Sequence, residues 1–204
     1  MLSGLFVNFS IRLFVFLTRW SIVGNNGSGK TVLMKCICGF LIPTEGEVIV
    51  NGKRVGKDVD FPPGLGLIIE TPGFLPNMTG VKNLEILASL NKKIGLEEIA
   101  AAIRRVGLDP LMKKPVGKYS LGMRQRLGIA QAIMENPSLL ILDEPLNGLD
   151  KHGVREMRQL IKGLKEQGKT ILLASHNQGD IDELCDTVCE MDAGVMTMIR
   201  EESI

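Results

Sequence analysis

A glycine-rich segment near the start of the chain, IVGNNGSGKT at residues 22–31, restricts the possible fold more than any other feature. It fits the pattern G-x-x-x-x-G-K-S/T, in which glycines let the backbone bend so that successive N–H groups point at phosphate oxygens. In this pattern the lysine places a positive charge on the outer phosphates, and the threonine hydroxyl ligates Mg²⁺. The residues predicted to bind phosphate and metal are Asn25, Asn26, Gly27, Ser28, Gly29, Lys30, Thr31 and Val32.

The surroundings of this loop distinguish a phosphate site from an ordinary glycine turn with an incidental lysine. Residues 21–23 predict the end of a strand, and residues 32–39 predict a helix that stops at Gly39. A helix that starts directly after the loop adds the preference of its N-terminus for anions. The strand–loop–helix context therefore favours the phosphate site.

The second motif is a pair of acidic residues that follows an unbroken apolar run at residues 139–142. Such a run is typical of a strand buried on both faces, as in a parallel sheet with helices on both sides. It delivers Asp143 and Glu144 to the edge where open α/β sheets bind ligands. Asp143 is expected to hold Mg²⁺, and Glu144 to take a proton from an attacking water. Alone, the pair could also be two acids that cap a strand without a metal.

The rest of the chain alternates strands with helices, which predicts an α/β architecture with a mostly parallel sheet. Residues 47–55 predict a small antiparallel hairpin around Asn51 and Gly52. Helices are expected at residues 81–90, 97–106, 123–134 and 154–166, and further strands at residues 65–69 and 170–174. We expect one domain over residues 1–204, with a helical subdomain at about residues 71–135.

Charge and composition exclude some partners. The chain has 24 basic and 23 acidic residues, a balance that argues against a nucleic-acid-binding surface. No run of 18 apolar residues occurs, so no transmembrane helix and a cytoplasmic location are expected. The four cysteines lack metal-site spacing and are expected to be buried free thiols.

Further motifs occur around the acidic pair, and their order along the chain resembles that of a known family. YSLGMRQR at residues 119–126 precedes the acidic motif, NGLD at residues 147–150 follows it, and His176 ends the next strand. Over about residues 22–200 the chain resembles the nucleotide-binding subunit of ATP-binding cassette (ABC) transporters, which have the fold of P-loop NTPases. The resemblance implies an ATPase with ATP and Mg²⁺ as ligands, and a head-to-tail dimer that encloses two ATP molecules.

The resemblance also implies roles for individual residues. Ser120 and Gly122 belong to the signature loop, which touches the γ-phosphate of ATP on the opposite subunit. Asp150 belongs to the D-loop at the dimer interface. Glu144 is the catalytic glutamate, and His176 is the switch histidine that contacts the γ-phosphate. Without the other motifs, His176 would be a strand-end histidine bonded to its neighbours.

Three features depart from the family pattern. Leu121 and Met123 replace a glycine and the glutamine of the signature loop, and Glu70 stands where many members have the glutamine of the Q-loop. The Glu70 carboxylate is also expected to approach Mg²⁺. Only 23 residues precede Gly24, so the N-terminal strands are expected to be incomplete, through truncation or a reading-frame error. No adenine-stacking aromatic is assigned, although Phe6 or Trp20 could substitute.

The resemblance predicts the partners as well. Residues 69–84 resemble the branch that exports drugs, peptide antibiotics or lantibiotics, so we expect a separate membrane-spanning permease and a second ABC subunit. The cassette would then lie on the inner face of the cell membrane. The expected docking surface is residues 70–87, with Phe74, Leu75 and Met78 as apolar contacts. Two alternatives are a soluble ABC-type ATPase without a membrane partner and a catalytically impaired cassette.

Overall fold

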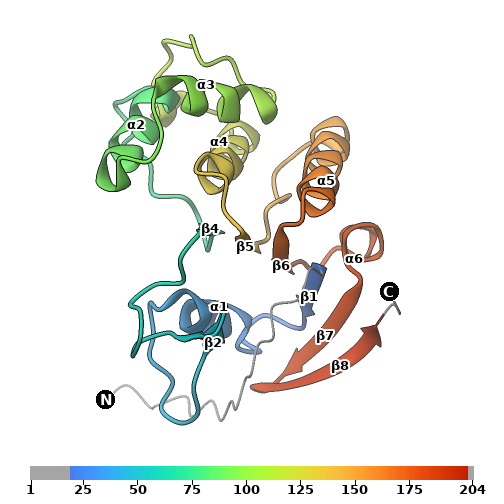
Figure 1. Ribbon diagram of the computed structural model, residues 1–204. Helices are drawn as coiled ribbons and strands as arrows, with labels where there is room; N and C mark the ends of the chain where they lie inside the picture. Colours follow the sequence, from blue (N-terminus) through green and yellow to red (C-terminus); the bar gives the residue numbers. More distant parts are fainter. Residues whose placement is uncertain (1–18, 202–204) are drawn as a thin grey trace, which may run out of the picture.

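The computed structural model describes residues 19–201, which form a layered α/β fold (Figure 1). Six strands form the main sheet in the order β4-β5-β6-β1-β7-β8, and β2 pairs with β3 in a separate hairpin. All neighbours in the main sheet are parallel except β7 and β8. The strands are β1 (Arg19–Val23), β2 (Ile49–Val50), β3 (Lys53–Arg54), β4 (Leu65–Ile68), β5 (Leu139–Asp143), β6 (Thr170–Ala174), β7 (Thr187–Asp192) and β8 (Val195–Glu201). The mostly parallel sheet and the small antiparallel hairpin confirm the predicted fold class.

Three of the described helices form a group of their own. Helices α2, α3 and α4 lie between β4 and β5 in sequence and gather at the β4 end of the sheet in Figure 1; they are called the helical group below. The helices are α1 (Lys30–Cys38), α2 (Gly80–Asn91), α3 (Leu96–Arg105), α4 (Leu121–Ile133), α5 (Lys151–Glu166) and α6 (Gln178–Leu184), with a 3₁₀ turn η1 (Val116–Lys118). Within the described residues, no helix is long and apolar enough to cross a membrane.

Helices α4 and α5 begin earlier in the chain than the apolar pattern predicts. The Ser120 hydroxyl accepts from the Met123 amide, and the Asp150 carboxylate accepts from the Gly153 amide at 2.7 Å. Short polar side chains at these positions cap the first turn, so α4 starts at Leu121 and α5 at Lys151. The residues that the apolar pattern leaves out of these helices are exposed or glycine, and hydrophobic periodicity therefore does not reveal them: Leu121, Gly122, Lys151, His152 and Gly153.

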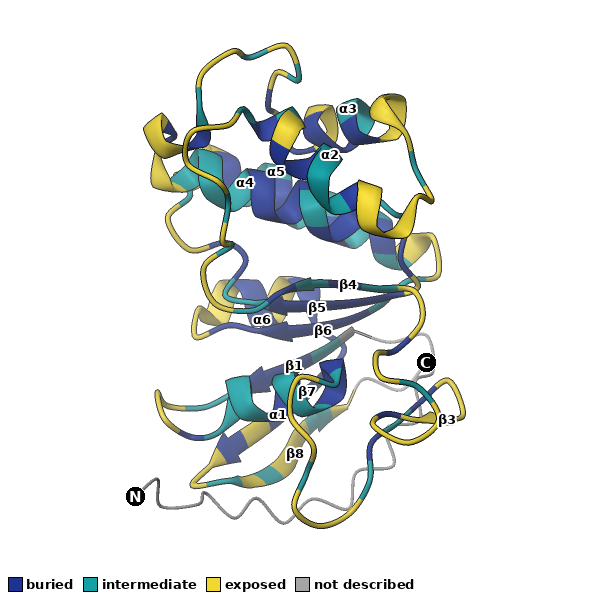
Figure 2. Cartoon of the chain, turned by 90° about the vertical axis from the view of Figure 1, so that its left-hand side faces the viewer, coloured by how far each residue is buried: buried dark blue, intermediate teal, exposed yellow. Residues whose placement is uncertain are grey.

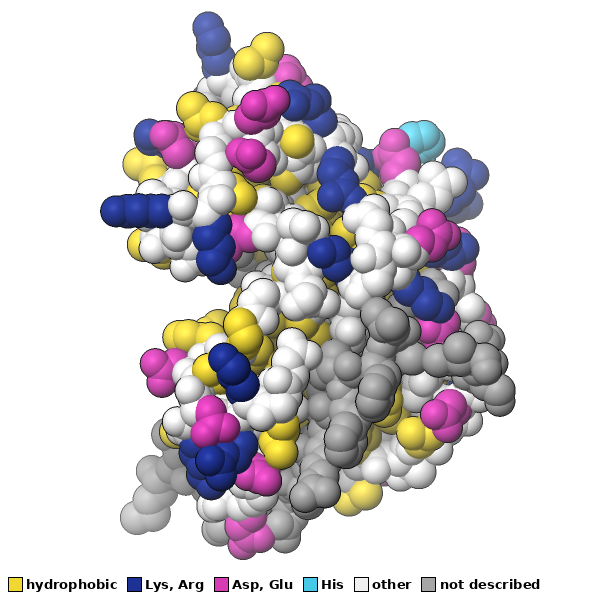
Figure 3. All heavy atoms as spheres, viewed as in Figure 1, with side chains coloured by type: hydrophobic (Ala, Val, Ile, Leu, Met, Phe, Trp, Pro, Cys, Tyr) yellow, Lys and Arg dark blue, Asp and Glu magenta, His cyan; other side chains and the backbone are white. Residues whose placement is uncertain are grey.

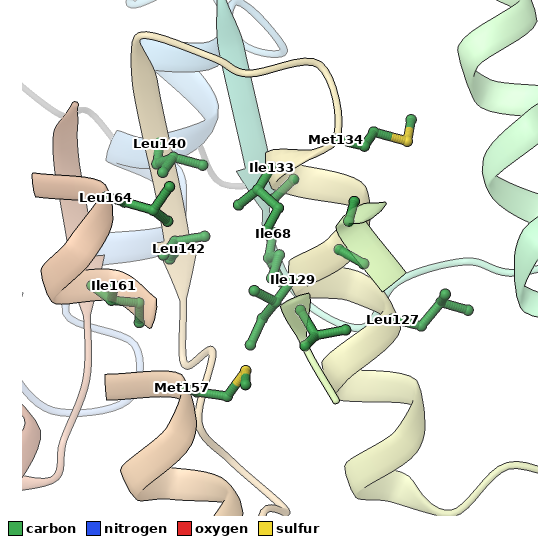
Figure 4. Close-up of a cluster of buried hydrophobic side chains, with 14 of the residues drawn as sticks. Ile68, Leu127, Ile129, Ile133, Met134, Leu140, Leu142, Met157, Ile161 and Leu164 are labelled. Carbon is green, nitrogen blue, oxygen red and sulfur yellow. The ribbon is translucent and has the colours of Figure 1, made fainter. Parts of the chain in front are cut away.

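The apolar run in β5 builds two cores, because alternate side chains of a strand point to opposite faces. Leu139 and Ile141 pack with α1, whereas Leu140 and Leu142 pack with residues of α4 and α5. Figure 2 shows the buried strands between α1 and the helical group, and Figure 4 shows the second core around Leu142. This arrangement confirms the prediction of a strand buried on both faces.

The hairpin and the cysteines also match the sequence analysis. The β2–β3 turn has positive φ at Asn51 (50°) and Gly52 (75°), as a two-residue hairpin requires. All four cysteines are free thiols, three of them buried and Cys36 partly buried. Burial raises the pKa of Cys38 to about 12, so this thiol is not a nucleophile near neutral pH.

The expectations for the first 18 residues, including Phe6, lie outside the described residues. Trp20, in contrast, lies in β1, where it is partly buried and packs against the core that surrounds α1.

Gly66 allows α4 to approach β4 closely, because a Cβ atom there would lie 2.0 Å from the Ala132 carbonyl oxygen. Gly66→Ala should therefore lower the free energy of unfolding by about 1–3 kcal/mol through overpacking. Gly163→Ala, near the end of α5, is the matched control, since nothing lies within 4 Å of its added Cβ. It should raise stability by about 0.5–1 kcal/mol. Urea unfolding measures both, and a Gly66 variant as stable as the wild type would contradict the packing argument.

Candidate nucleotide-binding site

The phosphate loop, residues 24–31, connects β1 to α1. Gly24 has φ 146°, and a Cβ atom there would lie 2.1 Å from the Met191 carbonyl oxygen, so the loop packs directly on β7. Gly29 caps α1 with φ 110° and without a side-chain hydrogen bond, which leaves the first amides of the helix to an anion. Nothing lies within 4 Å of a Cβ atom added at Gly27, so the loop is open on that side. This geometry suits a cradle for phosphate oxygens.

Two polar side chains of the loop support this fit. The Ser28 hydroxyl is buried and has no hydrogen-bond partner among the described atoms. The Lys30 ammonium donates to the carbonyls of Gly24 (2.6 Å) and Asn25 (3.0 Å), which holds the charge across the mouth of the loop. A buried hydroxyl without a partner is costly and indicates a group that a ligand would satisfy.

The structure brings Thr31 and Asp143 together across 112 residues of sequence. The Thr31 hydroxyl donates to the Asp143 carboxylate at 3.1 Å. Within the described residues no group of three or more His, Cys, Asp or Glu side chains could hold a metal. A site with a hydroxyl and one carboxylate suits Mg²⁺, because this ion keeps several waters and takes its other ligands from phosphates.

Glu144 and His176 also meet at this edge. Asp143 at the end of β5 lies opposite Ala174 at the end of β6, so the residues that follow emerge side by side. The Glu144 carboxylate lies 2.7 Å from His176 Nδ1, and the Glu144 amide donates to the Ala174 carbonyl at 2.9 Å. The predicted catalytic pair is therefore in direct contact, with His176 exposed and Glu144 mostly covered.

Glu70 has a different partner. Its carboxylate forms an ion pair with Lys35 on α1 at 2.7 Å, and its side chain is 63% exposed. The described contacts do not join it to the Thr31–Asp143 pair, and its role as a metal ligand stays a prediction.

The signature residues form a second place on the surface. Ser120, Gly122 and Asp150 line one cavity of about 500 Å³ together with Leu121 and Met123. Gly122 lies close to the Gly148 backbone, where an added Cβ would be 3.1 Å from the carbonyl oxygen. The described lining includes no residue of the phosphate loop. The chain thus presents its signature loop at a site separate from its own phosphate cradle.

Sequence reasoning missed two supporting interactions. Gln125 Nε2 donates to the Glu144 carbonyl at 3.1 Å, although the sequence analysis gave Gln125 no role. Asp180 bonds Arg158 of α5 on one side and the Ser175 hydroxyl, next to His176, on the other. Gln125 and Glu144 lie 19 residues apart, and Arg158 and Asp180 lie 22 apart, so spacing along the chain does not predict these contacts. Ser175 and Asp180, in contrast, are only 5 residues apart.

Comparison with known proteins agrees with this geometry. The family described as ABC transporter matches residues 15–147. The chain is 43% identical over 177 residues to the uncharacterized ABC transporter ATP-binding protein YybJ of Bacillus subtilis (strain 168), which covers 87% of this chain and 81% of that protein. It is 42% identical to the bacitracin transport ATP-binding protein BcrA of Enterococcus faecalis, covering 86% of this chain and 58% of BcrA. The lantibiotic transport ATP-binding protein SrtF of Streptococcus pyogenes is 35% identical, with 89% and 78% covered.

A solved structure shows the same fold. The dimeric ATP-binding cassette MJ0796, bound to ADP and Pi in a post-hydrolysis state, superposes with a TM-score of 0.80 at 22% identity. The match covers 91% of this chain and 87% of that chain. The family match over more than half of the sequence and the similarity to YybJ show that the chain belongs to the ABC transporter family and is one of its ATP-binding proteins.

Proposed function

We propose that this chain hydrolyses ATP as the energy-supplying subunit of an ABC transporter. The observation that carries the proposal is the convergence of the phosphate loop, the Thr31–Asp143 bond and the Glu144–His176 pair at one edge of the sheet. These groups provide phosphate binding, a metal position and a general base within one site.

Each group has a defined task in this proposal. The loop amides and Lys30 bind the phosphates, and Thr31 and Asp143 would hold Mg²⁺, which supplies positive charge to the phosphate oxygens when bound. Glu144 accepts a proton from the attacking water, while His176 fixes the Glu144 carboxylate through the 2.7 Å contact. Glu70 would join the metal only after leaving Lys35.

A second ABC subunit completes each site in this proposal. Ser120, Gly122 and Asp150 line their own cavity, and in a head-to-tail dimer they would face the nucleotide of the other subunit. The MJ0796 cassette, which has a similar fold, is described as a dimer. The partner is a second copy or a related cassette.

A membrane-spanning permease is the other proposed partner. Relatives named for bacitracin and lantibiotic transport favour export of drugs or peptide antibiotics, with the cassette on the cytoplasmic face of the membrane. In the proposed docking segment, residues 70–87, Leu75 (47%) and Met78 (37%) are exposed, whereas Phe74 packs against the core. Figure 3 shows a hollow between the helical group and the lower part of the molecule, with hydrophobic side chains on its lower rim.

The domain boundaries belong to the same proposal. One ABC domain spans residues 1–204, and residues 71–135, which contain α2, α3 and α4, act as its helical subdomain.

Lys30→Ala tests nucleotide binding. The variant should bind Mg-ATP about 10–100-fold more weakly, since hydrogen bonds to charged groups contribute about 1.5–3 kcal/mol. Titration calorimetry measures the affinity, and phosphate release measures hydrolysis. Lys53→Ala, a change of an exposed lysine in the β2–β3 hairpin, is the control and should leave both unchanged. Equal affinities for the wild type and the Lys30 variant would refute the proposed site.

A further inference from the structure

Gln125 makes a contact that the proposed reaction does not yet use. It lies in the second turn of α4, and its side-chain amide donates to the backbone carbonyl of Glu144 at 3.1 Å. The side chain is partly buried. The helical group is therefore bonded directly to the peptide of the proposed general base in the same chain.

The Glu144 backbone needs such support. Its φ is 49°, in the left-handed region that a non-glycine residue rarely adopts, and Pro145 follows it, which disfavours helical conformations further. Conformations of this kind cost about 1–3 kcal/mol and persist only where surrounding contacts hold them.

Three such contacts hold Glu144, one at its amide and two at its carbonyl. The amide is held by the Ala174 carbonyl of β6 at 2.9 Å. The carbonyl accepts from the Asn147 amide at 3.3 Å, which is long for a hydrogen bond, and from Gln125 at 3.1 Å. Gln125 thus supplies the shorter of these two hydrogen bonds to the Glu144 carbonyl.

Helix α4 holds the Gln125 amide in a fixed place. The next residue, Arg126, donates to the Val106 carbonyl and to the Glu156 carboxylate, both at 2.6 Å. This guanidinium ties the second turn of α4 to the end of α3 and to α5. Deeper in the helix, Gly128 packs against Pro72, where an added Cβ would lie 2.7 Å from the proline ring.

The same helix also carries the signature residues. Ser120 caps its N-terminus and Gly122 lies in its first turn, and both line the cavity shared with Asp150. A displacement of α4 at that cavity would therefore move Gln125 relative to Glu144.

We propose that Gln125 is a positioning residue for ATP hydrolysis: it holds the Glu144 peptide so that the carboxylate faces His176, and it makes this geometry depend on the position of α4. The inference rests on the proposed function, because Gln125 has this task only if Glu144 acts as the base. It predicts that loss of the amide affects the chemical step and leaves nucleotide binding in place.

Gln125→Met tests the inference, since it removes the donor and keeps a side chain of similar length. We expect kcat to fall about tenfold, as for the loss of one orienting hydrogen bond, with KM for ATP within about twofold of the wild type. Gln131→Met, a change of the other glutamine in α4, is the matched control and should keep the wild-type kcat. Gln125→Glu is the second variant, because its ionised carboxylate has nearly the same shape and cannot donate.

A double variant separates positioning from a purely structural role. In a Glu144→Gln background, Gln125→Met should cause little further loss, because the group that it positions is already disabled. A full additional tenfold loss, a loss confined to KM, or wild-type kcat in both Gln125 variants would overturn the inference. If the wild type shows no Glu144-dependent hydrolysis, the proposed function itself fails, which is a different result from normal hydrolysis in Gln125→Met.

Discussion

Glu144→Gln should slow ATP hydrolysis by about 10²–10⁴-fold and leave nucleotide binding intact, because it removes a general base and keeps the shape of the side chain. Lys30, Thr31 and Asp143, which are expected to hold the nucleotide and Mg²⁺, are unchanged. In the proposed dimer, a bound nucleotide that is not hydrolysed keeps the two subunits together. With Mg-ATP, the mass in solution should rise from 22.3 kDa to about twice that value, by the 1:1 pairing of subunits.

Light scattering measures the mass, and phosphate release measures the rate in the same samples. Glu166→Gln, at the exposed end of α5, is the control and should keep wild-type hydrolysis without accumulating a dimer. A Glu144 variant that hydrolyses ATP at the wild-type rate would remove Glu144 from the reaction. A monomer that binds no ATP would favour the impaired cassette instead.

Asp180→Ala should lower the free energy of unfolding by about 3 kcal/mol or more, the loss typical of removing one partner of a buried ion pair. The Asp180 side chain is 6% exposed and that of Arg158 is 17% exposed. Burial lowers the pKa of Arg158, but hydrogen bonds and charges from Asp180 and Glu183 outweigh it and raise this pKa overall. Without Asp180, the Arg158 charge loses its more buried partner and still pairs with the more exposed Glu183.

Asp180→Ala should also disturb the loop around His176, residues 175–177. One Asp180 oxygen accepts from the Ser175 hydroxyl at 3.1 Å, and the Ser175 oxygen accepts from the Asn177 amide at 3.1 Å. His176 lies between these two residues, so we expect hydrolysis to fall together with stability.

Asp182→Ala is the matched control on the same helix. Its side chain is 54% exposed and pairs with Arg200, so its removal should cost at most about 1 kcal/mol. Urea unfolding gives both values. Similar losses for the two variants would show that the Asp180 network contributes no more than a surface pair.

Local patterns in the sequence were sufficient for most of the elements and for the motifs of the site, but α6, β7 and β8 were not predicted. The glycine spacing at residues 24–31 places a loop between a strand and a helix, and the LLIL run at residues 139–142 identifies a strand buried on both faces. Because the carboxyl ends of parallel strands lie at one edge of a sheet, these two motifs were expected at the same edge. The Thr31–Asp143 bond agrees with that expectation.

The sequence by itself determined which residues could bind phosphate and metal, since turn geometry and hydrophobic periodicity act over a few residues. Only the tertiary structure decided which distant side chains meet. The strand order β4-β5-β6-β1-β7-β8 sets β5 beside β6 and so joins Glu144 to His176. Because α1 and α4 pack on the sheet, Lys35 of α1 contacts Glu70, and Gln125 of α4 contacts the Glu144 carbonyl. These pairings depend on how whole faces are buried, and spacing along the chain contains no information about them.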